Sequence, residues 1–127
     1  MTKTLTANQA DSETGFNRER ISQSRGPTYQ GDMRLVADYT TDPDGKKPAW
    51  QELEIWETRS GKWITVIMGR FSNPSDTRHF TKATLLEDVR RDDLDFQIAV
   101  AESLDWTSAA RVMLREQLGW KLAVEVE

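Results

Sequence analysis

The sequence predicts an α+β fold: an antiparallel β-meander of three to five strands, then two or three helices packed on one face of the sheet, then a C-terminal strand. Two observations support this order. Runs rich in β-branched and aromatic residues, separated by turn signals, fill the first half of the chain. Apolar residues in the second half recur with a helical period. Strands grouped before helices are typical of the α+β class.

The chain has 127 residues, enough for one domain with a hydrophobic core. Residues 1–32 are polar and show neither a helical nor a strand period. We therefore expect a flexible polar N-terminal arm over residues 1–32, followed by a single α+β domain over residues 33–127. The sequence leaves two roles open for the arm: it becomes ordered on a partner, or it covers an apolar face of the domain.

The most informative stretch, residues 50–71, holds three of the five tryptophans. Ser60 and Gly61 lie between two apolar runs, which predicts a β-hairpin with a two-residue turn and places Thr58 opposite Trp63. Side chains alternate along a strand, so this register defines two faces. The first face is aliphatic and contains Leu53, Ile55, Ile64, Val66 and Met68. The second face is mainly aromatic and acidic and includes Trp50, Glu52, Glu54, Trp56, Trp63 and Phe71.

Both faces of the predicted hairpin are rich in apolar side chains, whereas a sheet with one wet face alternates apolar with polar residues. The aliphatic face is expected to meet the helices. Three explanations compete for what covers the aromatic face: other parts of this chain, such as the N-terminal segment; a protein partner or a second copy; or a small ligand such as a nucleobase. Tryptophan is enriched at interface hot spots, which favours the aromatic and acidic set as a protein-binding site.

The other elements follow from local signals. Residues 33–41 alternate as a first strand, and Pro-Asp-Gly at 43–45 marks the turn before the hairpin. Residues 77–82 are expected to form a short fourth strand. Thr84 and Glu87 have capping-box spacing, which predicts a short helix that begins there.

Two further helices have clear end signals. Asp92 or Asp93 is expected to cap the second helix, and Thr107 or Ser108 the third, which Gly119 ends. Residues 120–127 alternate between apolar and polar side chains, and they predict the C-terminal strand, which would join the same sheet.

Composition argues against several kinds of chemistry. The chain has no cysteine, so it offers no disulfide, thiolate zinc site or cysteine nucleophile. It has no glycine-rich phosphate-binding motif, and its net charge of −4 argues against general binding to a phosphate backbone. We expect no cofactor and no metal ion. The absence of a long apolar run and of a secretory signal predicts a cytoplasmic protein that does not enter a membrane.

Two catalytic or metal-binding alternatives have some support in the sequence. His79, the only histidine, lies near Asp76, and this pair is the single candidate for general base catalysis. The second half is locally acidic, at Glu87, Asp88, Asp92, Asp93, Asp95 and Glu102. These acids have three interpretations: helix caps on a solvated face, a patch that meets a basic partner or imitates nucleic-acid phosphate, and a carboxylate Mg²⁺ site.

The leading hypothesis is a small non-catalytic intracellular interaction protein, an inhibitor or adaptor, that covers a surface of a larger protein through the aromatic and acidic face. A phage- or plasmid-encoded anti-defence inhibitor, for example of the anti-CRISPR type, is one concrete form, although no residue specifies that origin. A homodimer through the same face is equally consistent with the pattern. The alternative is a nucleic-acid-binding accessory protein that uses the locally basic arm and helix arginines: Arg18, Arg20, Arg25, Arg111 and Arg115.

Overall fold

The computed structural model describes residues 15–126, and the structural statements below refer to that part of the chain. Its five strands form one antiparallel sheet whose spatial order is the sequence order, β1-β2-β3-β4-β5. Two helices follow, which confirms the expected α+β meander. The elements are β1 Asn17–Ile21, β2 Tyr29–Thr40, β3 Ala49–Thr58, β4 Trp63–Phe71, β5 Phe80–Leu86, α2 Leu94–Ser103 and α3 Ser108–Leu118.

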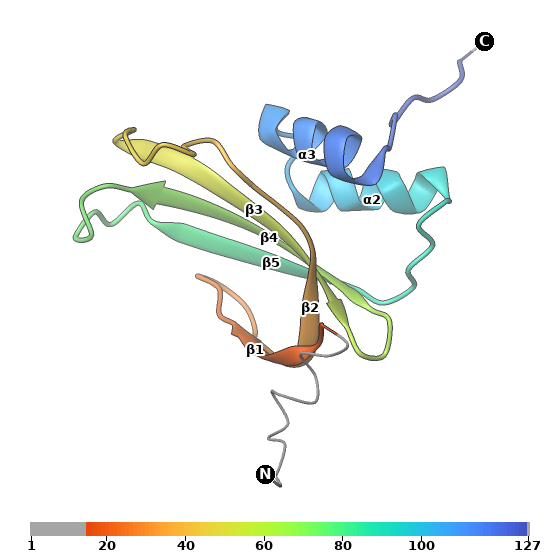
Figure 1. Ribbon diagram of the computed structural model, residues 1–127, viewed down its shortest axis with the longest axis horizontal. Coiled ribbons are helices and arrows are strands. Elements are labelled where there is room, and N and C mark those ends of the chain that lie inside the picture. Colours follow the sequence, from red (N-terminus) through yellow and green to blue (C-terminus); the bar gives the residue numbers. More distant parts are fainter. Residues whose placement is uncertain (1–14, 127) are drawn as a thin grey trace, which may run out of the picture.

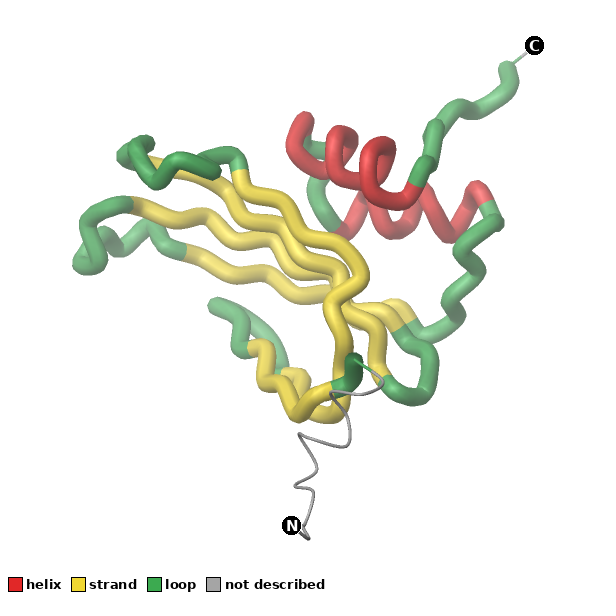
Figure 2. The backbone as a smooth tube through the Cα atoms, viewed as in Figure 1, coloured by secondary structure: helices red, strands yellow, loops and turns green. Residues whose placement is uncertain are grey.

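The sheet is strongly curved, with different elements on its two sides (Figure 1). The helices α2 and α3 lie on one side of the sheet, and β1 curls beneath the other side. The strands β3, β4 and β5 project beyond the helices at one end. Figure 2 shows the same arrangement as a backbone tube, in which all strands precede the helices. The side that carries the helices is called the helix side, and the other is called the concave face.

The β3–β4 turn has three residues rather than the expected two. The Thr58 amide donates to the Lys62 carbonyl at 2.8 Å, and the Gly61 amide donates to the Thr58 carbonyl at 2.9 Å. Gly61 has a φ of 92°, a left-handed conformation that glycine adopts at low cost and that three-residue hairpin loops require at their last position. Glu57, and not Thr58, therefore pairs with Trp63.

Because the register differs from the predicted one by one residue, each side chain of β4 lies on the opposite face of the sheet from the one predicted, relative to the side chains of β3. The predicted composition of both hairpin faces is therefore wrong. The helix side of the hairpin is formed by Leu53, Ile55, Trp63, Thr65 and Ile67. The concave face of the hairpin is formed by Trp50, Glu52, Glu54, Trp56, Ile64, Val66, Met68 and Arg70.

Trp63 is central to the core on the helix side, where its side chain is fully buried. Its ring stacks on Trp120 with centroids 6.0 Å apart, and it meets the edge of Phe96 at 5.5 Å. A buried hydrogen-bond chain lies beside these rings: the Thr65 hydroxyl donates to Ser103 Oγ at 2.7 Å, and Ser103 donates to the Val100 carbonyl at 2.6 Å. Aromatic packing and a satisfied polar contact thus hold α2 against β4.

The helix end signals are confirmed. The Asp93 carboxylate accepts from the amides of Asp95 and Phe96 at the start of α2, and the Thr107 hydroxyl accepts from the Ala110 amide at the start of α3. Gly119 ends α3 with a φ of 72°. Because each of these signals acts within one helical turn, local sequence was sufficient to place them.

The short helix predicted at Thr84 is wrong, because residues 80–86 form β5. Thr84 pairs with Thr65 of β4, while Leu85 packs on the concave side and Leu86 on the helix side. Successive leucines on opposite faces suit a strand buried on both sides. The hydrogen bonds between β5 and β4 therefore determine the structure of residues 80–86, although Thr84 and Glu87 have the spacing of a helix cap.

The predicted C-terminal strand is absent from residues 120–126, which form neither a helix nor a strand. Trp120 is buried against α2 and β4, and its amide donates to the Leu114 carbonyl at 3.1 Å. Leu122 has a φ of 53°, which interrupts an extended backbone. Anchoring of Trp120 in the core thus turns the chain away from the sheet.

The flexible arm predicted for residues 1–32 requires a correction, since residues 17–21 form β1 and β2 begins at Tyr29. Ile21 is 8% exposed and belongs to the same buried cluster as Met33. A few apolar residues are enough to anchor β1, because the other strands supply most of this buried cluster. The low apolar content of residues 1–32 therefore led to the wrong prediction of a flexible arm. The part of the predicted arm before residue 15 lies outside the described residues.

We predict that Trp63→Ala lowers the free energy of unfolding by about 3–5 kcal/mol, since it leaves a cavity beneath α2. Trp50→Ala, which removes a partly buried ring from the concave face, should cost about 1 kcal/mol. Urea denaturation followed by far-UV circular dichroism measures both values. Equal losses in the two variants would contradict the assignment of these tryptophans to different environments.

Candidate functional site

The concave face is covered over one half by the chain itself. After β1, the Ser24 amide donates to the Thr81 carbonyl at 2.8 Å, and the Thr81 amide donates to Ser24 Oγ at 2.9 Å. The Ala83 amide donates to Gln23 Oε1 at 3.0 Å. These bonds join the segment after β1 to the outer edge of β5, in line with Met68 and Val66 of β4, so the sheet nearly closes along β5. The enclosed core contains Ile21, Met33, Ile64, Val66, Met68 and Ala83, with Tyr29, Trp56 and Leu85 packed against it.

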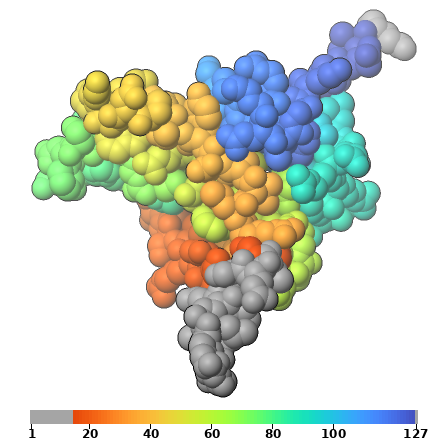
Figure 3. Space-filling model, in the orientation of Figure 1, coloured from red at the N-terminus to blue at the C-terminus, as the bar shows by residue number. Residues whose placement is uncertain are grey.

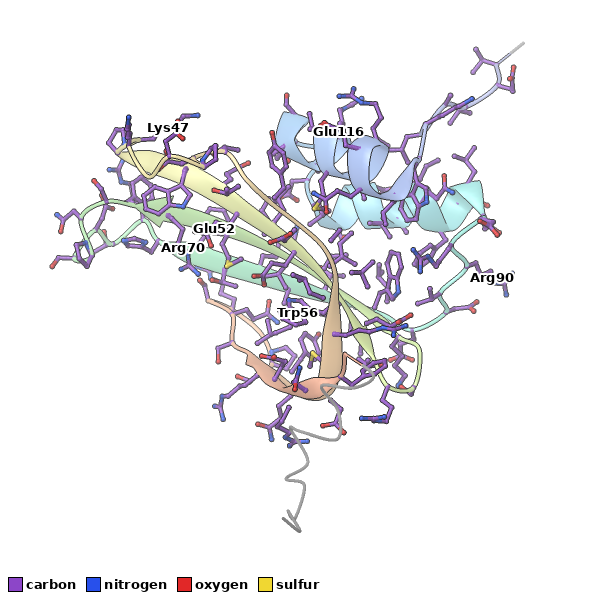
Figure 4. All side chains as sticks on the ribbon, viewed as in Figure 1. Lys47, Glu52, Trp56, Arg70, Arg90 and Glu116 are labelled. Carbon is purple, nitrogen blue, oxygen red and sulfur yellow. The ribbon has the colours of Figure 1, made fainter. Side chains whose placement is uncertain are left out.

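The other half of the concave face is open, and we call it the open half. Its central residues are Trp50, Glu52 and Glu54, with Trp56 at the boundary with the covered half. The Trp50 indole N–H donates to Glu52 Oε2 at 2.8 Å, and the Trp56 indole N–H donates to Glu54 Oε1 at 2.9 Å. Figure 4 shows Glu52, Trp56 and Arg70 along the side of the strands that faces away from the helices.

A hollow of about 590 Å³ lies in the open half, between β2, β3 and the loop that joins them. Among the described residues that line it, four carry carboxylates, whereas Lys47 is the only one with a cationic side chain. The Lys47 ammonium donates to the Thr41 carbonyl at 2.6 Å and is thereby held at the loop. The residues that line the hollow are Asp38, Tyr39, Thr40, Asp42, Gly45, Lys47, Trp50, Glu52, Leu53, Glu54 and Ser72.

The carboxylates of the open half are not neutralised by ion pairs within residues 15–126. Asp38 lies directly opposite Glu54 across β2 and β3, and like charges in this position destabilise a sheet. None of the ion pairs of the described chain involves Asp38, Glu52 or Glu54. Each glutamate uses one oxygen for an indole N–H, which leaves Glu52 Oε1 and Glu54 Oε2 as acceptors for another group.

The structure brings together four of the six residues predicted to bind protein: Trp50, Glu52, Glu54 and Trp56. Trp63 lies in the core on the opposite side of the sheet, and the change of register explains this difference. Phe71 also lies on the helix side, where its ring meets the edge of His79 at 5.5 Å and the Arg78 guanidinium at 4.4 Å.

Sequence reasoning missed the contribution of β2 to the site, because Asp38 was treated only as part of a strand. A register shift between Leu35 and Ala37 places Asp38 on the concave face, opposite Glu54. A β-bulge of this kind changes which side chains share a face. The alternation of Ala37 and Tyr39 with Asp38 and Thr40 was the available signal, but the sequence alone did not specify the pairing strand.

The five arginines proposed for nucleic-acid binding do not form one surface. All are exposed. Arg18 and Arg20 lie on β1 and Arg25 in the loop that follows, whereas Arg111 and Arg115 lie on α3. Figure 1 shows β1 and α3 on opposite sides of the sheet. The Arg111 guanidinium lies 5.1 Å from the centre of the Trp106 ring.

His79 and Asp76, the candidate catalytic pair, contact other groups. His79 Nε2 lies 3.0 Å from the Asn73 carbonyl oxygen. Asp76 accepts from Arg78 Nε at 3.1 Å and from Arg78 Nη2 at 2.8 Å. Hydrogen bonds from the Arg78 side chain and amide lower the pKa of Asp76 to about 2. The carboxylate is thus held by Arg78 as part of a surface turn.

Some of the acidic residues in the second half of the chain make contacts with residues close to them in the sequence. Asp93 caps α2, and Asp88 forms an ion pair with Arg90 at 3.1 Å. Over residues 15–126, no group of three or more His, Cys, Asp or Glu side chains is arranged to hold a metal ion.

Two further findings concern the whole described chain. Neither α2 nor α3 has the length and apolar character that a membrane-spanning helix requires. Comparisons with protein-family models, with curated proteins and with solved structures give no match. The site must therefore be interpreted from its own geometry.

We predict that Arg78→Ala raises the pKa of Asp76 from about 2 toward its ordinary value of 3.8, because the variant loses the side-chain hydrogen bonds that stabilise the carboxylate. Since the folded-state pKa is lowered, the contribution of Asp76 to stability is present above its ordinary pKa and is lost as the pH falls toward 2. A carboxyl-detected NMR titration measures both proteins. An unchanged pKa in the variant would contradict the role of Arg78.

Proposed function

We propose that this protein is a non-catalytic interaction protein that binds a larger protein partner through the open half of the concave face. The observation that carries the proposal is the pair of tryptophan–glutamate contacts on a part of the sheet that the described chain leaves uncovered. The tryptophans supply apolar surface, and each glutamate is held in a defined orientation. Preorganised aromatic and charged groups of this kind are typical of binding hot spots.

The charge of the open half favours a partner with basic side chains. Asp38, Glu52 and Glu54 have no ion pair within the described part of the chain. An arginine of the partner would pair with a carboxylate and could also stack on Trp50. Binding would thereby relieve the repulsion between the carboxylates of Asp38 and Glu54. This repulsion is present in the unbound protein.

The hollow alone is too small to form the whole interface, since eleven residues line it, whereas a stable interface involves about 20–30 residues on each partner. We place the rest of the contact on the surrounding open half, from the β2–β3 loop to Trp56. By covering a basic surface of a larger protein, the molecule would act as an inhibitor or as an adaptor, and the anti-defence inhibitor considered above is one such case.

The first test is site-specific photo-crosslinking in the native host. We predict that a photoreactive amino acid at Ser72, which lines the hollow, gives a discrete protein adduct. The same amino acid at Glu116, an exposed position on α3, should give no such adduct. Figure 4 shows Glu116 on the far side of the helices from Glu52. Mass spectrometry of the adduct identifies the partner, and a Ser72 probe that gives no adduct would contradict the proposal.

Once the partner has been identified, we predict that Glu54→Gln weakens its binding by about tenfold or more, since the variant loses a negative charge that would pair with a basic side chain of the partner. Trp50→Ala should weaken binding further while the fold is retained. Glu116→Gln is the matched control, because it removes one negative charge from the opposite side of the molecule. Isothermal titration calorimetry at low and high salt gives the affinities. Equal binding by Glu54→Gln and Glu116→Gln would exclude the open half as the interface.

A further inference from the structure

A second hollow lies beside the β3–β4 turn, and we call it the turn hollow. Its volume is about 400 Å³, within the range of about 300–1,000 Å³ that is typical of small-molecule sites. The start of β2, the β3–β4 turn and single residues of β4 and β5 surround it. It shares no lining residue with the hollow of the open half. Figure 1 and Figure 3 show the β3–β4 turn and the β2–β3 loop, which borders that other hollow, at opposite ends of the molecule.

The floor of the turn hollow is apolar. Met33 of β2 and Ile64 of β4 are buried there. Tyr29 of β2 and Leu85 of β5 are half-buried and pack against the same cluster. Between Tyr29 and Met33, Gly31 leaves a space, since apart from its chain neighbours no described atom lies within 4 Å of the position that a Cβ would occupy. An apolar group in this hollow would therefore displace water from side chains of three strands.

The rim of the turn hollow is cationic at Arg59 and Lys62. Arg59 Nε lies 3.4 Å from Asp32 Oδ2, so this guanidinium has an acidic partner. Lys62 precedes Ile64 by two residues, which places its half-buried side chain on the same face of the sheet. The Lys62 amide donates to the Thr58 hydroxyl at 3.0 Å. The Lys62 ammonium, in contrast, makes no hydrogen bond and no ion pair with residues 15–126.

The charges around the turn hollow favour an anion. Among the described residues that line it, Arg59 and Lys62 are cationic and Asp32 is the only acid, although the whole chain has a net charge of −4. A half-buried ammonium without an acceptor has lost water that nothing in the described chain replaces. A carboxylate would supply a charge-assisted hydrogen bond at this position. Because the apolar floor belongs to the same hollow, the ligand that fits both features is a carboxylate with an apolar body.

We propose that the turn hollow binds a small aliphatic carboxylate, with the carboxylate group at the Lys62 ammonium and the hydrocarbon body against Met33, Ile64 and Leu85. The body is assigned as aliphatic because these three floor side chains are aliphatic. The site uses neither Trp50 nor the carboxylates of the open half, so it is independent of the proposed function. Either site can therefore be disproved without affecting the other.

The test is an NMR titration of the full chain with octanoate, followed through backbone amide and methyl signals. We predict saturable shifts centred on Gly31, Lys62, Ile64 and Leu85. Octan-1-ol has the same hydrocarbon body without the charge, and it should bind about tenfold more weakly or worse, because it cannot form the ion pair with Lys62. This comparison uses the unchanged chain, so it does not depend on the folding of a variant.

Lys62→Met keeps a linear apolar side chain but removes the ammonium, and it should weaken octanoate binding by about tenfold or more while octan-1-ol binding is retained. Lys46→Met is the matched control, because Lys46 is an exposed lysine of the β2–β3 loop that lines neither hollow. It should bind octanoate as tightly as the unchanged chain does.

Four results would overturn the proposal. Octanoate could cause no saturable shifts, or shifts confined to residues outside the turn hollow. Octan-1-ol could bind as tightly as octanoate, which would remove the role of the charge. Equal octanoate affinities of Lys62→Met and Lys46→Met would show that the Lys62 ammonium does not hold the carboxylate.

Discussion

The register of the β3–β4 hairpin is the constraint on which the rest of the structure depends. It is set by a three-residue turn in which Gly61 is left-handed, so that Glu57 pairs with Trp63. This pairing directs Trp63 to the helix side, where Trp120 and Phe96 pack on its ring. Side chains alternate strictly along a strand, so the same pairing keeps Trp50 and Trp56 on the concave face. The length of this turn therefore determines that Trp63 lies in the core, whereas Trp50 and Trp56 lie at the candidate site.

The two halves of the concave face differ because the segment after β1 reaches only the outer edge of β5, beside Val66 and Met68 of β4, and leaves the β2–β3 side of the same cross-strand rows uncovered. Where it does, apolar residues from four strands form a closed core. Where it does not, β2 and β3 place Asp38 and Glu54 opposite each other without an ion pair among the described residues. A local conflict of this kind on the surface of a fold is typical of a site selected for binding rather than for stability.

Sequence reasoning succeeded where the determining contacts are local and failed where they are distant. The caps at Asp93 and Thr107, the end of α3 at Gly119 and the α+β order all follow from residues close together in the chain. The turn length, the assignment of residues 84–86 to β5 and the path after Trp120 depend on pairing with β4 and on packing in the core. The sequence predicted that the site would be acidic and aromatic, but it did not identify Asp38 as part of the site. Trp63 was wrongly assigned to the site because the predicted register differed from the observed one by one residue.

The most direct test of this account is the cross-strand pattern of nuclear Overhauser effects between β3 and β4 in the isolated protein. The register described above predicts close backbone contacts between Glu57 and Trp63, and between Ile55 and Thr65. Contacts between Thr58 and Trp63 instead would mean that the hairpin has a two-residue turn. Trp63 would then lie beside Trp56 on the concave face, and the separation of core from candidate site would be wrong.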